Sequence, residues 1–166
     1  METSGRDLSQ IGVLCGGSEA GATATAYELI NDQQQTGPLT GTYLIETLTS
    51  WRSAAAARRF ITVDRQAVDQ SGSCSVTDSG AADEYTGDYA GSPPQDCIGA
   101  GQFFATHVHT TSPSEPFPYD GFLVEAQCGT MTITVKVENN LPEAVTQQST
   151  EGYLSSAISK LDSFTR

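Results

Sequence analysis

The sequence predicts a β-rich α+β fold, an antiparallel sheet or sandwich (jelly-roll-like is one form it could take) with one helix in the first third and a C-terminal helix. One observation is the strict alternation of apolar and polar residues over 130–139. Residues 121–128 supply a matching apolar face, and Gly129 between the two segments predicts a hairpin. A stripe at helical spacing predicts the C-terminal helix over about 151–163. The stripe consists of Leu154, Ile158 and Leu161.

The helix in the first third is predicted from a second apolar stripe. This stripe consists of Leu44, Leu48, Trp51 and Ala55. The alanines at 54–57 have high helix propensity, which supports the same prediction. Arg58 and Arg59 are expected to end this helix, because cations are favourable at the carboxyl end of a helix dipole. A shorter helix is expected over 20–30, with Ser18 as its cap.

The remaining elements of the single domain, 1–166, are strands and one long loop. Strands are expected at 11–14, at 60–63 with a continuation to 68, and at 102–110. Residues 69–100 are polar, acidic and rich in glycine and proline, so we expect a long acidic loop there. A structureless loop of this length is unusual in a compact domain, which favours a stapled or functional loop.

The negative charge of the chain is unevenly distributed. The formal net charge is −12, and residues 66–135 contain nine acidic residues but no lysine or arginine. Such a surface repels phosphate backbones, so no nucleic acid is expected as a partner. The apolar runs are too short for a membrane span. The low lysine content is compatible with a protein of a high-salt environment, or with an ordinary acidic extracellular or viral protein.

Four cysteines are separated widely enough to exclude a CxxC metal or redox motif. An even number of separated cysteines favours two disulfides, and the pairing Cys74–Cys97 with Cys15–Cys128 is the most natural of three possible connectivities. Four reduced, buried thiols in a cytosolic domain are the alternative. Disulfides favour an extracellular or virion location, although no basic start followed by an apolar stretch marks a secretory signal.

The only two histidines, His107 and His109, stand two positions apart on a predicted strand. Alternation places both imidazoles on one face, close enough to share a divalent metal or an anion. A third ligand would come from Glu115, Asp120 or Glu125. The alternative is a pair of strand histidines that face solvent or an interface. No cofactor other than such a metal is indicated.

This segment resembles the first motif of the cupin family, in which Gly, His-x-His, Glu and Gly follow one another at set intervals. The corresponding residues are Gly101, His107, His109, Glu115 and Gly121. The resemblance implies a jelly-roll barrel that binds a divalent metal through His107, His109 and Glu115. It covers about 21 residues, the glutamate is displaced by one position, and the histidine of the family's second motif is missing.

A partial resemblance to small fungal guanyl-specific ribonucleases lies in the same region. The matching residues are Ala105, His109, Thr110, Tyr119, Asp120, Gly121, Phe122 and Cys128. That reaction also needs a histidine and an arginine upstream of the strand. No histidine precedes His107, and no arginine lies between Arg65 and His109. The catalytic residues of that family therefore cannot be assembled here.

The sequence contains no complete catalytic signature: nucleophile elbows, phosphate-binding loops and dinucleotide motifs are all missing. The function that it favours is a non-enzymatic structural or interaction protein of an extracellular assembly, such as a virion or surface-appendage subunit. Its partners would be other protein subunits in a homo-oligomer or larger assembly. The alternative is a small metal- or carbohydrate-binding domain that uses His107 and His109, with a metal-dependent enzyme as its extension.

Overall fold

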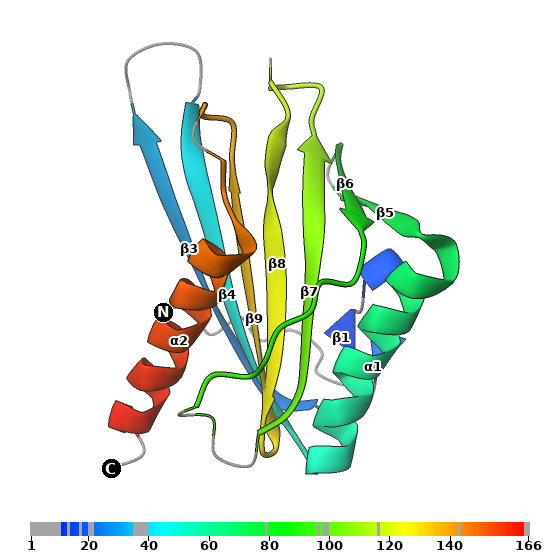
Figure 1. Ribbon diagram of the computed structural model, residues 1–166, viewed down its shortest axis with the longest axis vertical. Helices are drawn as coiled ribbons and strands as arrows, with labels where there is room; N and C mark the ends of the chain where they lie inside the picture. Colours follow the sequence, from blue (N-terminus) through cyan, green and yellow to red (C-terminus); the bar gives the residue numbers. More distant parts are fainter. Residues whose placement is uncertain are drawn as a thin grey trace.

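A seven-stranded antiparallel sheet with one helix on each face forms the centre of the protein (Figure 1). The computed structural model describes residues 11–12, 14–16, 18–19, 22–34, 40–78, 80–95, 97, 100–115, 117–142 and 144–164. The strands of this sheet are β3 (Ala22–Gln34), β4 (Thr40–Trp51), β5 (Ser73–Asp78), β6 (Ala81–Thr86), β7 (Ala100–Thr111), β8 (Tyr119–Cys128) and β9 (Met131–Asn139). The helices are α1 (Ala54–Ser71) and α2 (Gln147–Phe164).

The strands lie side by side in the order β3-β4-β9-β8-β7-β6-β5, and every neighbouring pair is antiparallel. A separate two-stranded sheet joins β1 (Ile11–Gly12) to β2 (Ser18–Glu19), with the short 3₁₀ helix η1 (Leu14–Gly16) between them. The predicted fold class is confirmed, and a single sheet covered by helices is the form that it takes. No helix among the described residues has the length and apolar character needed to span a membrane.

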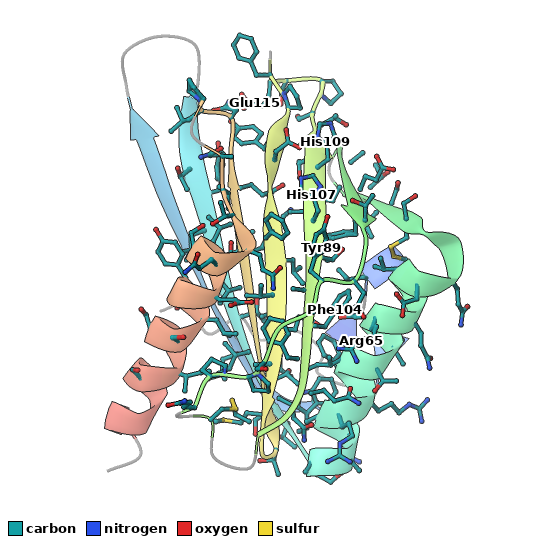
Figure 2. The ribbon with its side chains drawn as sticks, in the orientation of Figure 1. Arg65, Tyr89, Phe104, His107, His109 and Glu115 are labelled. Atoms are coloured by element: carbon teal, nitrogen blue, oxygen red, sulfur yellow. A yellow bond between two sulfur atoms is a disulfide. The ribbon has the colours of Figure 1, made fainter. Side chains whose placement is uncertain are left out.

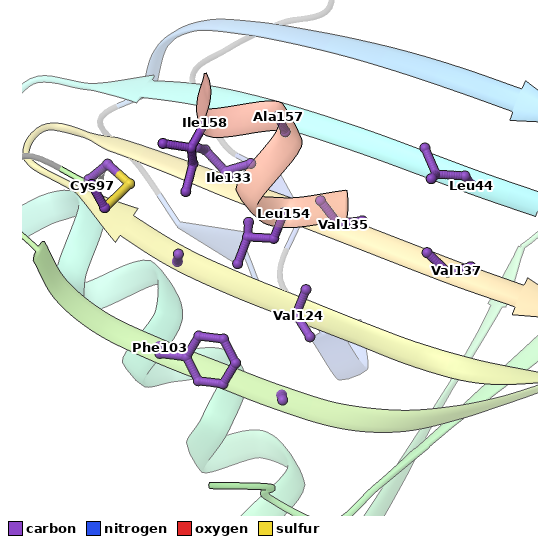
Figure 3. Close-up of a cluster of buried hydrophobic side chains, with 13 residues drawn as sticks. Leu44, Cys97, Phe103, Val124, Ile133, Val135, Val137, Leu154, Ala157 and Ile158 are labelled. Carbon is purple, nitrogen blue, oxygen red and sulfur yellow. A yellow bond between two sulfur atoms is a disulfide. The ribbon is translucent and has the colours of Figure 1, made fainter. Parts of the chain in front are cut away.

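Each face of the sheet carries its own apolar core. On one face, α2 packs Leu154 and Ile158 against strand residues that include Val124 and Val135 (Figure 3). On the other face, α1 packs Phe60, Ile61 and Val68 against Phe104, Val108 and Leu123. The predicted β8–β9 hairpin is confirmed, because Cys128 pairs with Met131 around the turn at Gly129. Because successive side chains of a strand point to opposite faces, the same strands contribute apolar residues to both cores.

Helix α1 begins at Ala54 and continues past Arg59, so the helix predicted from the stripe of Leu44, Leu48, Trp51 and Ala55 is wrong for most of its length, and so is its predicted end. Leu44 and Leu48 are four residues apart, and an even spacing also places side chains on one face of a strand, here β4. The helix starts where the hydroxyl of Ser53 accepts a hydrogen bond from the Ala56 N–H at 3.2 Å. It ends at Gly72, whose φ of 71° is the left-handed conformation that glycine adopts without strain.

Other local predictions are also corrected by the structure. The strand predicted at 60–63 belongs to α1, and 22–30 of the helix predicted over 20–30 lie in β3, with 20–21 outside the described residues. The predicted loop over 69–100 contains the end of α1 and the hairpin β5–β6. The part without strands is 87–95, here called the strap, which crosses β7 and β8 on the α2 side (Figure 1).

The four cysteines form two disulfides as predicted, but the predicted pairing is wrong. The bonds are Cys15–Cys74 and Cys97–Cys128, with Cα atoms 5.6 Å and 5.1 Å apart. Helix α1 returns the chain to η1, so Cys74 at the start of β5 meets Cys15 rather than Cys97. Because Ala100 pairs with Cys128 in the sheet, Cys97, three positions before Ala100, bonds to Cys128. The topology of the sheet therefore decides the connectivity.

Replacing Cys97 and Cys128 together by serine is expected to lower the free energy of unfolding by about 2–4 kcal/mol. The bond joins residues 31 positions apart and closes the segment that contains β7 and β8, so its loss enlarges the unfolded ensemble. Urea denaturation of the double variant and the parent measures this difference. Equal stability would contradict the expectation. The double serine variant at Cys15 and Cys74 provides the comparison for the other bond.

Candidate functional site

The two histidines stand in rows of side chains that cross the sheet. Pairing of β6, β7, β8 and β9 places Glu84, His109, Asp120 and Asn139 side by side in one row. The next row on the same face contains Thr86, His107 and Phe122. These seven residues, together with Tyr89 of the strap, are called the histidine face (Figure 2). The expectation that both imidazoles share one face of a strand is met by this register.

Asp120 links the two imidazoles. Its Oδ1 atom lies 2.8 Å from Nδ1 of His109 and 3.7 Å from Nε2 of His107. The side chains of His107, His109 and Asp120 are 32%, 36% and 58% exposed, so a partner in solution can reach all three. The strands beneath them are paired on both sides, and the three groups are therefore held on a rigid surface.

Aromatic rings border the imidazoles. Phe122 packs edge-to-face against His107 at 5.5 Å between ring centroids and against Tyr89 at 5.3 Å. Tyr89 itself is 41% exposed. Its backbone N–H donates to the carbonyl of Ala105 at 2.9 Å, which holds the strap on β7. The exposed ring of Tyr89 is therefore a fixed part of the histidine face.

Both helices hold the strap in place. From α1, the guanidinium of Arg65 reaches Asp88, with 3.1 Å between Nε and Oδ2, and it also donates to the Phe103 carbonyl. Burial raises the pKa of the Asp88 carboxyl and Asp69 adds to this, while Arg65 opposes the rise. From α2, the side-chain amide of Gln147 donates to the Ala90 carbonyl at 2.9 Å. Arg65 and Gln147 thus hold the residues on either side of Tyr89.

The structure places the three candidates for a third metal ligand differently. Asp120 lies beside the imidazoles, whereas Glu125 is buried on the opposite face under α1. Glu115 lies beyond His109 in the turn between β7 and β8 (Figure 2). Among the described residues, no group of three histidine, cysteine or acidic side chains is arranged to hold a metal ion. Metal binding at His107, His109 and Glu115 thus remains a prediction.

A buried ionic cluster on the α1 side of the sheet was missed from the sequence. The Lys136 ammonium lies 2.6 Å from Oδ2 of Asp83 and 2.8 Å from Oε2 of Glu138. The Thr110 hydroxyl hydrogen-bonds to both carboxyls, and the Tyr85 hydroxyl donates to Asp83 at 3.1 Å. These five residues are called the Lys136 cluster.

Glycine at position 121 makes room for this cluster. Gly121 pairs with Glu138, and a Cβ atom there would lie 1.8 Å from the Val137 carbonyl oxygen. Without a side chain at 121, the Glu138 carboxyl can extend across β8 to Thr110 on β7. A lone glycine inside a strand was the available signal of such a close approach.

The surroundings shift the pKa values of the two carboxyls of the cluster in opposite directions. Burial favours the neutral form of Asp83, but the Lys136 ammonium and the hydrogen bonds outweigh it and lower the pKa of Asp83. Burial dominates at Glu138 and raises the pKa of that carboxyl despite Lys136. Burial and the charge of Asp83 also raise the pKa of Tyr85 well above its usual value. A single ammonium therefore stabilises two carboxyls.

A second buried pair consists of Asp64 of α1 and Glu125 of β8. Both residues are only 1% exposed. The backbone N–H of Leu14 donates to Asp64 at 2.7 Å, and the Thr134 hydroxyl donates to Glu125 at 3.1 Å. Burial, and then the adjacent Asp64, raise the pKa of Glu125 well above its ordinary range. The surroundings of this pair therefore favour the neutral, protonated form of the Glu125 carboxyl.

The fold is similar to that of one solved structure. The chain is similar to the extracellular domain of PknH from Mycobacterium tuberculosis, with a TM-score of 0.54 and 12% sequence identity. The similarity covers 84% of this chain, which spans 66% of the length of that domain. No family model matches the sequence, and no curated protein sequence matches it either. At this identity the likeness concerns the fold, and it agrees with the predicted fold class.

Proposed function

We propose that this protein works outside the reducing cytosol as a non-enzymatic interaction domain. The observation that carries the proposal is the pair of disulfides, each of which joins segments distant in sequence. Such bonds form and persist mainly in extracellular and other oxidising compartments. The similar fold of an extracellular domain supports the same location.

The contact surface in this proposal is the histidine face. Its histidine and aspartate groups are exposed on paired strands and the Tyr89 ring is exposed on the strap, so a partner can reach them without a conformational change. The finer form of the proposal is a subunit of a virion or of a surface appendage, in which copies of the chain contact one another. If the contact joins two different surfaces of neighbouring copies, it produces a ring or an open polymer.

The proposal predicts that cysteines are labelled by an alkylating agent only after reduction. We expect no label on the folded, unreduced protein and label on all four cysteines after denaturation with reductant, as read by intact mass. Native mass spectrometry of the oxidised protein tests self-association, and oligomers are expected for an assembly subunit. Label on folded protein as isolated from its cells would contradict the extracellular location, and a strict monomer would contradict the assembly.

The second candidate function is binding of a divalent metal or a carbohydrate at the histidine face. One observation favours it: a single carboxylate oxygen of Asp120 faces both imidazoles, and an imidazole–carboxylate set suits zinc and similar ions. Titration with zinc, followed by measurement of bound metal, is expected to give one ion per chain. Replacement of His107 and His109 by glutamine is expected to abolish binding. Absence of stoichiometric metal in the parent would contradict this function.

A further inference from the structure

The Cys15–Cys74 disulfide fastens a small N-terminal unit to the rest of the fold. This unit, called the clasp, consists of β1, η1 and β2, and its strands form a two-stranded sheet of their own. We infer that this disulfide is a redox latch: a dithiol that reduces it frees the clasp from α1 and β5, while Cys97–Cys128 stays oxidised. This role goes beyond the proposed function.

Apart from the disulfide, the clasp is held through η1, which contacts both α1 and β5 (Figure 1). The Leu14 N–H donates to the buried Asp64 at 2.7 Å, and the half-buried Leu14 side chain packs against the core under α1. In the described part of the chain, no strand of the clasp pairs with the main sheet. The contacts of Leu14 are therefore the main hold on Cys15 once the two sulfur atoms are no longer bonded.

The fold holds the cysteines of the other disulfide more firmly. Cys97 and Cys128 are 4% and 9% exposed, and both lie in the core under α2. Cys128 is the last residue of β8 and pairs with Ala100 of β7 and Met131 of β9, so its backbone stays in the sheet whether or not the bond is present. Two thiols that remain this close have a high effective concentration and re-form their bond readily. A buried disulfide is also less accessible to an attacking thiolate.

Two features of the Cys15–Cys74 bond favour its reduction. Both cysteines are half-buried, so a thiolate in solution can reach their bond. Cys15 also has a φ of 66° and a ψ of 25°, and in the described part of the chain it is the only residue other than glycine with a positive φ. This left-handed conformation costs free energy in a residue that carries a Cβ atom. Release of the clasp lets Cys15 return to an ordinary conformation, which favours the reduced, open state.

The reductant is a dithiol, of the kind that a CxxC oxidoreductase carries. One of its thiolates attacks a sulfur of the Cys15–Cys74 bond and forms a mixed disulfide, and its second thiol then releases the protein. Two electrons and two protons pass to Cys15 and Cys74, which become thiols, and the reductant becomes a cyclic disulfide. Withdrawal of Leu14 exposes part of the core that it shares with Val63 of α1 and Val76 of β5. Reduction thereby uncovers an apolar patch beside the edge strand β5.

The test incubates the oxidised full chain with graded dithiothreitol under native conditions, followed by an alkylating agent and peptide mass spectrometry. We expect Cys15 and Cys74 to be labelled at dithiol concentrations about tenfold lower than those that label Cys97 and Cys128. Between the two midpoints, hydrogen exchange should rise in the clasp and in the part of α1 beside it, but not in β7, β8 and β9. Reduction of both bonds together, or of Cys97–Cys128 first, would overturn the inference. So would reduction of Cys15–Cys74 without faster exchange in the clasp.

A pair of leucine variants tests whether Leu14 keeps the latch closed. Leu14→Ala weakens the hold on Cys15, so the dithiol concentration that opens Cys15–Cys74 should fall about fivefold further. Leu48→Ala removes a half-buried leucine from the core under α2 and should leave that concentration unchanged. Equal shifts in the two variants would mean that general destabilisation opens the bond, which contradicts a latch held by Leu14. If Leu14→Ala does not fold, the order of reduction in the parent protein still decides.

Discussion

Replacing Lys136 by methionine is expected to lower the free energy of unfolding by about 3–5 kcal/mol. The ammonium lies within 2.8 Å of both Asp83 and Glu138, and its side chain is only 12% exposed. Methionine keeps much of the volume of lysine but leaves two carboxyls without their cation. One or both must then take up a proton or draw in water. Urea denaturation at neutral pH measures the loss.

The control for Lys136→Met replaces the two carboxyls that Lys136 contacts with neutral amides. Adding Asp83→Asn and Glu138→Gln removes the unpaired charges, so the triple variant should recover a large part of the lost stability. Lys160→Met, at the only other lysine of the chain, controls for the loss of one positive charge. If Lys136→Met alone does not fold, recovery of folding in the triple variant still tests the explanation. A triple variant no more stable than the single one would contradict it.

The strands whose apolar residues alternate without interruption could be predicted from the sequence. In β9, apolar and polar residues alternate throughout, so its place in a hairpin with β8 followed directly. In α1, the apolar stripe that faces the sheet includes Ala57, Ile61 and Val68, but Asp64 stands in the middle of it. This buried acid hides the helical period, which explains why the segment was assigned to a strand instead.

The candidate site was only partly predictable for a related reason. His-x-His on a strand fixes the face of both imidazoles, but the carboxylate beside them comes from the neighbouring strand. Its identity depends on the register of β7 with β8. Asp120 was one of three candidates, and spacing along the chain could not select it. The Lys136 cluster brings together β6, β7 and β9, so no spacing along the chain could reveal it.

Stability should also fall as pH rises, because burial beside Asp64 favours the protonated form of Glu125 in the folded protein. The pKa of Glu125 is raised in the folded state, so the folded protein holds its proton more tightly than the unfolded chain does. This contribution is fully present below the unfolded value, near 4.5. It is lost progressively as the pH rises above that value and through the raised pKa of the native state.

Glu125→Gln should remove this part of the pH dependence. The glutamine amide can donate to Asp64 at every pH, so the variant should be more stable than the parent on the alkaline side, by about 1–3 kcal/mol. Urea denaturation of both proteins across the pH range measures the difference. Asp69→Asn, an exposed carboxyl on the same helix, should leave the alkaline limb of the profile unchanged. Parallel profiles for Glu125→Gln and the parent would show that the pair does not share a proton.

If the profiles differ as expected, docking of α1 and of the Leu14 segment on the sheet depends on that proton, because Asp64 joins both of them to Glu125.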